Sequence, residues 1–217
     1  KIREGSYEYG PEHGDQILQQ AVDLVETWHG REDGRVTCQM AVHATDTCSP
    51  DHMRKVLDLA EQYDLGRTIH LAQNSNEVEL ALRLRGGTPV KYLDEVGFLG
   101  PRLIGAHCTY VNEGDIRLLA ETGTNISHNP AMNAKRGRIA PIPDFVDAGG
   151  NVGMGSDNMS EDMVEVMRVG LMVNRIKRQN PTNPQPEDVL DWATMSSPEE
   201  SWNSVQGMSW GGSSPET

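Results

Sequence analysis

The sequence has little of several features that mark common classes of protein. Its 217 residues include only three cysteines, Cys38, Cys48 and Cys108, an odd number without CxxC spacing. We therefore expect reduced, mostly buried thiols rather than a disulfide framework or a structural zinc finger. No apolar run approaches the roughly 18 residues of a membrane span, and no signal segment opens the chain, so we expect a cytoplasmic protein without a membrane partner.

Positive charge is also scarce. There are 19 Lys and Arg against 32 Asp and Glu, which gives a net charge of -13. This balance disfavours nucleic acid as a partner, because the phosphate backbone would be repelled. Neither a GxGxxG nor a Walker phosphate loop occurs, so a metal-free nucleotide-dependent α/β enzyme ranks last. The length predicts one domain with a sizeable core.

Short apolar runs alternate with helical patterns through most of the chain. This alternation is typical of βα units around a parallel sheet and predicts the α/β class. Residues 1–15 show no period and are predicted to form a loop or frayed end. The predicted strands are 35–43, 67–70, 101–107, 124–127 and 151–156. The predicted helices are 16–28, one opened by Ser49 as N-cap, 76–84, a short one from Thr88, 113–121, part of 139–148, 162–178 and 186–195.

Three predicted strands end in residues that can bind a metal: His70, His107 and Asp157. Carboxyl ends of parallel strands converge at the mouth of an α/β barrel, so the ordered set predicts a catalytic metal site. Taken singly, His70 could be a hydrogen-bonded core histidine and Asp157 a helix cap. His107 could be a ligand or could polarise a substrate beside the metal. His43 also closes a strand and is expected to face the same mouth.

Five short motifs occur in order along the chain: Val-His-Ala-x-x-Thr-Cys-Ser at 42–49, Ile-His-Leu-Ala-x4-Glu at 69–77, Gly-Ala-His-Cys at 105–108, Ser-His-Asn-Pro-x-x-Asn at 127–133, and Gly-Ser-Asp-Asn at 155–158. They resemble the motifs of the amidohydrolase superfamily, in particular its branch of cytosine-deaminase-like enzymes and triazine hydrolases (chlorohydrolases). The similarity covers roughly residues 16 to 195 and implies a (β/α)8 TIM barrel of the metal-dependent hydrolase type.

The resemblance implies a role for each site residue. Metal ligands would be His70 and Asp157, with Asp157 also the catalytic proton acceptor, and His107 would contact the attacking water or the substrate. The expected metal is one zinc ion, although iron or manganese also suits such ligands. The implied reaction uses a metal-bound hydroxide to break a C–N or C–Cl bond of a small nitrogen heterocycle. The implied substrate-binding residues are His43, Gln73, His107, His128 and Asn133.

Two departures from the family pattern limit these expectations. The His-x-His pair of the first strand does not occur, so the barrel is expected to lack its first strands and half of its metal ligands. Gln73 stands where many deaminases of the branch carry a proton-shuttling Glu. A glutamine can orient a substrate by hydrogen bonds but cannot shuttle a proton, which leaves deamination and dechlorination both open. Glu77, one helical turn further on, is expected to face solvent.

The predicted domain boundary follows from the same comparison. Residues 1–195 are expected to form the partial catalytic barrel, and residues 196–217 an irregular tail that does not match the family and that suggests a truncated or frame-shifted gene. Open sheet edges and uncovered apolar faces favour association, so we expect a homo-oligomer. The alternative function is a catalytically incomplete barrel remnant that binds a ligand or partner without turnover.

Overall fold

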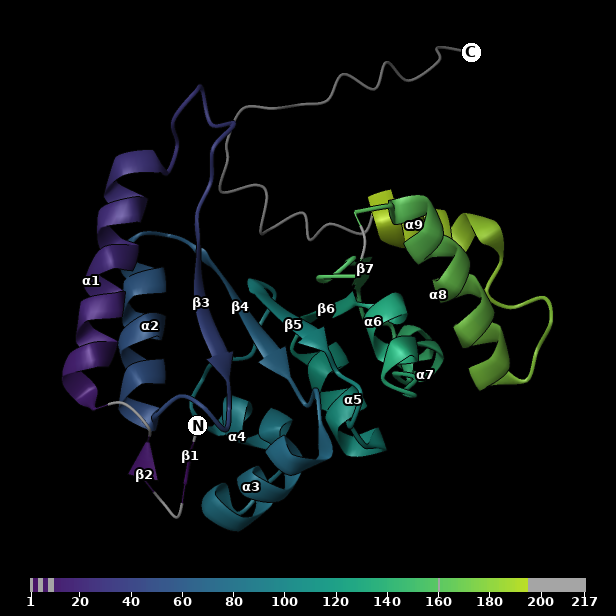
Figure 1. Cartoon of the computed structure of the whole chain (residues 1–217), viewed down its shortest axis with the longest axis horizontal. Coiled ribbons are helices and arrows are strands. Elements are labelled where there is room, and N and C mark those ends of the chain that lie inside the picture. The colour runs from purple at the N-terminus through teal and green to yellow at the C-terminus, as the bar shows by residue number, and fades with distance from the viewer. Residues whose placement is uncertain (1, 4–5, 8–9, 160, 195–217) are drawn as a thin grey trace.

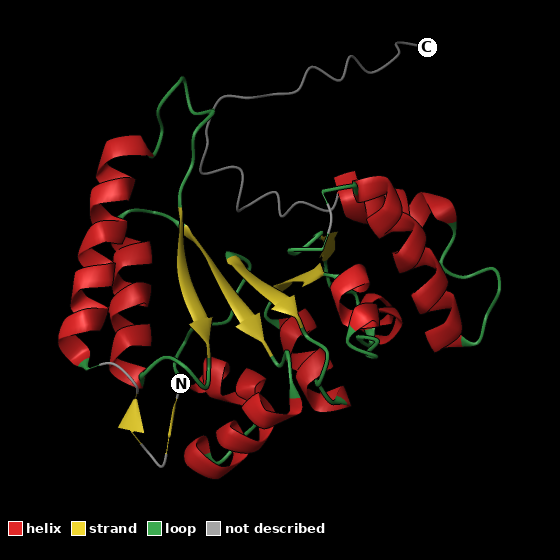
Figure 2. Cartoon of the chain, in the orientation of Figure 1, coloured by secondary structure: helices red, strands yellow, loops and turns green. Residues whose placement is uncertain are grey.

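A single parallel sheet organises the structure. The computed structural model describes residues 2–3, 6–7, 10–159 and 161–194, and its helices and strands alternate along the chain (Figures 1 and 2). Each strand pairs with the next one in sequence, and all four pairings are parallel. The five strands are β3 (Gln39–Ala44), β4 (Gly66–Leu71), β5 (Leu103–His107), β6 (Asn125–His128) and β7 (Val152–Met154).

Helices make every crossover between these strands, as parallel neighbours require. Helix α1 precedes β3, and α8 and α9 follow β7 at the opposite end of the sheet (Figure 1). The crossover helices are α2 (Pro50–Gln62), α3 (Ser75–Arg85), α4 (Pro89–Glu95), α5 (Glu113–Glu121), α6 (Pro130–Lys135) and α7 (Ile142–Asp147). The flanking helices are α1 (Pro11–Trp28), α8 (Met163–Arg178) and α9 (Pro186–Thr194).

The two faces of the sheet differ in how they are covered. In β3, Met40 and Val42 are buried, whereas Gln39 and Ala41, which alternate with them, are exposed. This alternation follows from the period of two in a strand. The covered face packs against helices through a core of large side chains that are 0–2% exposed. Among them are Phe98, Leu103, Leu119, Ile126, Ile142 and Phe145.

Most of the predicted elements are confirmed. Helix α5 spans 113–121 as predicted, and a capping box explains its sharp start: the Asn112 and Asp115 side chains each accept the other residue's backbone N–H. Ser49 caps α2 by accepting the backbone N–H of His52 at 3.1 Å. Cys38, Cys48 and Cys108 form no disulfide with one another, and Cys108 is buried. None of the helices in the described residues is long and apolar enough to cross a membrane.

Three local predictions are wrong. Helix α1 begins at Pro11 instead of Gln16, because proline suits the first helical turn and Glu12 lies near the positive helix end. Its first turn is mostly exposed and so carries no apolar period. Residues 2–3 and 6–7 pair as the antiparallel strands β1 (Ile2–Arg3) and β2 (Ser6–Tyr7) within the predicted loop. Helix α6 follows His128 closely, in a segment where no helix was predicted.

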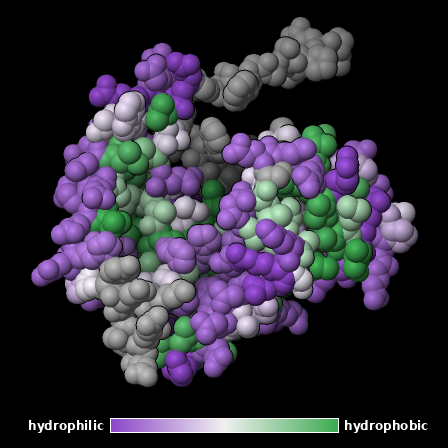
Figure 3. All heavy atoms as spheres, viewed as in Figure 1, coloured by the Kyte–Doolittle hydropathy of each residue, from purple (hydrophilic) through white to green (hydrophobic). Residues whose placement is uncertain are grey.

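Large hydrophobic side chains remain exposed at both ends of the sheet. Figure 3 shows hydrophobic atoms over the α8–α9 end as well as over the α1 side. The exposed large hydrophobic residues include Leu24 and Trp28 of α1, and Val164, Met172 and Ile176 of α8. The predicted tail, residues 196–217, lies outside the described residues.

Candidate functional site

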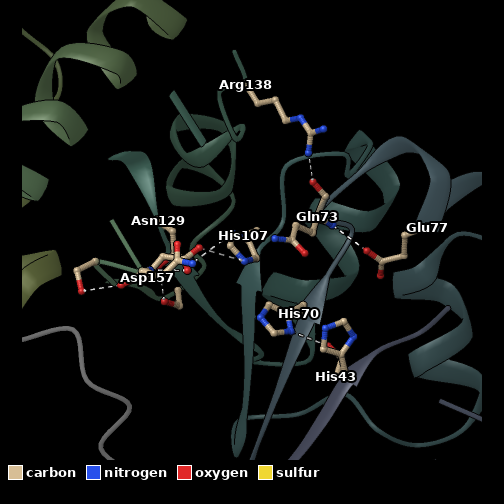
Figure 4. Close-up of polar contacts among 11 residues, drawn as sticks. His43, His70, Gln73, Glu77, His107, Asn129, Arg138 and Asp157 are labelled. Carbon is tan, nitrogen blue, oxygen red and sulfur yellow. Dashed lines mark hydrogen bonds and ion pairs between the residues drawn. The ribbon is translucent and has the colours of Figure 1, made fainter. Parts of the chain in front are cut away.

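Three imidazoles lie together at the carboxyl ends of neighbouring strands. The ring centroids of His43 and His70 are 5.0 Å apart, and those of His70 and His107 are 5.5 Å apart in a stacked arrangement. Asp157, in the turn after β7, completes the group: its Oδ2 lies 3.9 Å from Nε2 of His107. Figure 4 shows these residues gathered at the strand ends. The structure therefore brings together four of the predicted site residues.

A backbone hydrogen bond fixes the orientation of His70. Its Nδ1 lies 2.7 Å from the carbonyl oxygen of His43. A carbonyl can only accept, so Nδ1 carries the hydrogen and donates it. In the neutral ring the lone pair is then on Nε2, which is the arrangement found in metal-binding histidines whose other nitrogen is held by an outer acceptor.

His107 is held as a neutral ring facing a carboxylate. Burial lowers the pKa of His107 to about 4, although Asp157 and a hydrogen bond with Asn133 act in the opposite direction. The Asn129 Nδ2 donates to Nδ1 of His107 at 3.3 Å, and its Oδ1 accepts from the Ser127 hydroxyl. With Nδ1 as acceptor, the remaining ring hydrogen lies on Nε2, toward Asp157. Near neutral pH, His107 is thus a hydrogen-bond donor at the site.

Backbone strain accumulates around the same strand ends. Four non-glycine residues there have positive φ: Ala72 at 47°, His107 at 77°, Cys108 at 45° and Asp157 at 53°. Each such conformation costs on the order of 1–3 kcal/mol and persists where the surroundings enforce it. Packing is also close at Gly155, where a Cβ would lie 2.3 Å from Oδ1 of Asn129. The clustering supports a functional site at this edge of the sheet.

Gln73 lies in the loop after β4, and Glu77 lies in the first turn of α3. Gln73 is half-buried, and its backbone is held on both sides, by Glu77 at the N–H and by Arg138 at the carbonyl. The expectation that Glu77 faces solvent is wrong, because its exposed fraction is 0%. Burial raises the pKa of its carboxyl, against hydrogen bonds from Gln73, Thr45 and Ala72 that lower it. Buried hydrogen-bond donors, rather than water, surround this carboxylate.

His128 and Asn133 are both buried. His128 is the last residue of β6 and is fully buried, with its Nε2 3.2 Å from Nδ2 of Asn174 in α8. Burial lowers the pKa of His128 to about 3. Asn133, in α6, is 3% exposed and lies beside His107. Their contacts with substrate stay predictions.

The residues fit a divalent metal by their chemistry, since His70 offers a free Nε2 and Asp157 a carboxylate. Asp157 has one oxygen, Oδ1, accepting the backbone N–H of Asn158 at 2.7 Å, which orients the other toward His107. Across the described part of the chain, no group of three or more His, Cys, Asp or Glu side chains is arranged to hold a metal ion. A catalytic zinc takes about three protein ligands, so these two would form part of a set.

Sequence reasoning missed three contributors to this region. Asn129 orients His107, Thr45 donates its hydroxyl to Glu77 at 2.9 Å, and Arg138 donates to the Gln73 carbonyl at 2.9 Å. Asn129 lies inside the 127–133 motif, which is the only signal that could have indicated it. Arg138 is 65 residues from Gln73 in sequence, so no local pattern predicts their contact.

Comparison with known protein families identifies the family of this chain. The model of the amidohydrolase family matches residues 4–199 of the chain. The chain belongs to the amidohydrolase family. The match extends beyond the range 16–195 over which the sequence motifs were compared.

Individual relatives place the chain within this amidohydrolase family. It is 37% identical over 172 residues to a 5-methylthioadenosine/S-adenosylhomocysteine deaminase of Desulforamulus reducens, covering 77% of this chain and 40% of that protein. A zinc-bound adenosine deaminase from Xanthomonas campestris superposes with a TM-score of 0.80 at 25% identity, over 87% of this chain and 44% of that one. A zinc complex of atrazine chlorohydrolase from Arthrobacter aurescens gives a TM-score of 0.77 at 23% identity, over 87% and 43%.

The family match confirms the amidohydrolase family, and the structural similarities confirm the fold. The chain spans less than half the length of the relatives it matches. Its five parallel strands form part of a TIM barrel of the metal-dependent hydrolase type.

Proposed function

We propose that this amidohydrolase chain supplies the β3-to-β7 part of a metal-dependent deaminase site that acts on adenosine-type amines. The observation that carries the proposal is the pairing of a neutral imidazole with a carboxylate, His107 Nε2 to Asp157 Oδ2 at 3.9 Å, beside the oriented ring of His70. The deaminase relatives supply the substrate class. His70 and Asp157 would hold one divalent metal, zinc first, which when bound acts as a Lewis acid that activates water.

Each of the site residues has its own role in the proposed reaction. Asp157 accepts the proton of the attacking water, and the Nε2–H of His107 holds that water or the ring atom under attack. Gln73 orients the heterocycle through its amide, because it cannot exchange a proton at neutral pH. His43 contacts the substrate from β3, and His128 and Asn133 line the far side. A homo-oligomeric state of the chain stays a prediction.

Ammonia release tests this function directly. Zinc-saturated chain is incubated with 5-methylthioadenosine or adenosine, and released ammonia is measured. Asp157→Asn keeps the shape of the side chain but cannot accept a proton, so it should lower the rate about 10²–10⁴-fold. The control His52→Ala, at a partly buried histidine of α2 whose ring lies against Gly14 of α1, should leave the rate unchanged.

Two other outcomes would redirect the assignment. Chloride released from a chlorotriazine without ammonia from the purines would favour the C–Cl reaction of the triazine branch. No ammonia above the Asp157→Asn level would contradict the deaminase proposal. It would support the alternative of a barrel remnant that binds without turnover, which the partial set of metal donors favours.

A further inference from the structure

A single buried carboxylate joins the loops that follow β3 and β4. Glu77, in the first turn of α3, is 0% exposed. Its Oε1 accepts the Thr45 hydroxyl at 2.9 Å and the Ala72 N–H at 3.1 Å, and its Oε2 accepts the Gln73 N–H at 2.9 Å. Thr45 comes from the loop after β3, whereas Ala72 and Gln73 follow β4. Both carboxylate oxygens therefore bind backbone or hydroxyl donors from the site loops.

Residues 72–73 also form hydrogen bonds with two further loops. The Ala72 carbonyl accepts the N–H groups of Thr109 at 3.1 Å and Tyr110 at 2.9 Å, just after β5. The Gln73 carbonyl accepts from Arg138, whose guanidinium lies 5.3 Å from the centroid of the Tyr110 ring. Figure 4 shows Glu77 and Arg138 on the two sides of the Gln73 backbone. Residues 72–73 thus connect the loops after β3, β4 and β5 with the loop between α6 and α7.

Helix capping does not account for this arrangement. In a capping box, the glutamate of the first turn bonds the backbone N–H of the N-cap residue. The Asn74 side chain does cap α3 by accepting the Glu77 N–H at 3.0 Å. The Glu77 carboxylate, however, reaches past the N-cap to residues 72 and 73 and across to Thr45. It also holds Ala72 at its positive φ of 47°, a conformation that a residue with a Cβ adopts only under constraint.

We propose that Glu77 is a positioning residue: it fixes the segment 72–73, and with it the Gln73 side chain and the neighbouring metal-binding edge. This proposal rests on the proposed function for the meaning of that edge. Glu77 itself lies behind the loop and acts through the groups it holds. Glutamine cannot replace it, because its amide nitrogen would meet an N–H donor where the carboxylate presents an acceptor.

The decisive experiment compares Glu77→Gln with Glu79→Gln in the full chain. Glu79 lies in the same helix and is exposed, so it is a matched control for the loss of one charge. Amide hydrogen exchange is measured at residues 72, 73, 109 and 110, with core residues Leu119 and Ile126 reporting global stability. Glu77→Gln should raise exchange at the four loop amides at least about 10-fold relative to the core amides. Zinc affinity should fall about 10–100-fold, as for other lost outer-shell contacts.

The outcomes separate this proposal from the proposed function. Unchanged loop exchange in Glu77→Gln, or core exchange rising as much as loop exchange, would overturn the positioning role. If exchange rises only at the loop amides while zinc affinity matches wild type, Glu77 holds the loop without affecting the metal-binding edge. That result would also overturn the positioning role. A wild-type chain without zinc affinity would sink the proposed function, and loop exchange would still decide whether Glu77 fixes the segment. If Glu77→Gln does not fold, Thr45→Val removes one donor and should show a smaller change at the same amides.

Discussion

Replacing His70 with alanine is expected to weaken zinc binding more than about 100-fold. The Nδ1–H of His70 is held by the His43 carbonyl, so Nε2 is presented as a ligand without loss of further rotamer freedom. Loss of an outer-shell partner alone costs about 10–100-fold in metal affinity, and removal of a ligand should exceed that. Asp157→Ala should have a similar effect, because each variant leaves only one of the two proposed donors. Competition with a chromogenic chelator measures the affinity.

His52→Ala is the control for the loss of an imidazole. His52 lies in the first turn of α2, its backbone N–H donates to the Ser49 hydroxyl oxygen, and its ring lies against Gly14 of α1. It should bind zinc as wild type does. Equal affinities for wild type, His70→Ala and Asp157→Ala would show that any bound zinc lies elsewhere, and the assignment of these ligands would then be wrong.

Acidification is expected to destabilise the fold well before its carboxylates titrate fully. Burial lowers the pKa of His128 to about 3 and that of His107 to about 4, from 6.5 in an unfolded chain. Below pH 6.5 the unfolded state therefore binds more protons than the folded state, so the free energy of unfolding falls as pH falls. Each of the two imidazoles contributes a slope of about 1.4 kcal/mol per pH unit, down to about pH 4 for His107 and about pH 3 for His128.

Urea unfolding at pH values from 7.5 to 4 measures this slope. His128→Gln should remove the contribution of one imidazole and lower the slope by about 1.4 kcal/mol per pH unit relative to wild type, whatever its effect at pH 7.5. Glu77 works in the opposite direction, because its raised pKa lets the folded state take up a proton first. The comparison of slopes cancels that shared contribution. A free energy of unfolding that stays constant from pH 6.5 to 4 in wild type would contradict the buried, neutral state of both histidines.

Much of the fold could be predicted because local signals agreed with one another. The segment 103–107 is apolar, follows a proline and ends in His107, and it forms β5 within the predicted range of 101–107. Helix α5 matched its predicted range, and the Asn112–Asp115 capping box that defines its start is a short-range feature. The start of α1 was missed because the turn from Pro11 to Gln16 is mostly exposed, and without burial no apolar period appears.

The site could be predicted only as far as strand ends determine it. His43, His70 and His107 meet because each lies at the end of a parallel strand, a property readable from the sequence. Glu77 was misjudged because its spacing says only that it lies in the first turn of a helix, where carboxylates usually face water. Its burial depends on Thr45, 32 residues away, and on the fold of the Ala72 backbone over it. Such contacts are set by tertiary packing.

The most direct measurement is the position of zinc in a crystal of the zinc-saturated chain, from anomalous scattering at the zinc absorption edge. We predict one anomalous peak at the carboxyl ends of β4 and β7, about 2.0–2.2 Å from Nε2 of His70 and from an oxygen of Asp157. A peak held by other residues, or no peak at this edge of the sheet in zinc-saturated crystals, would contradict the claim that these strand ends form the metal-binding part of an amidohydrolase site.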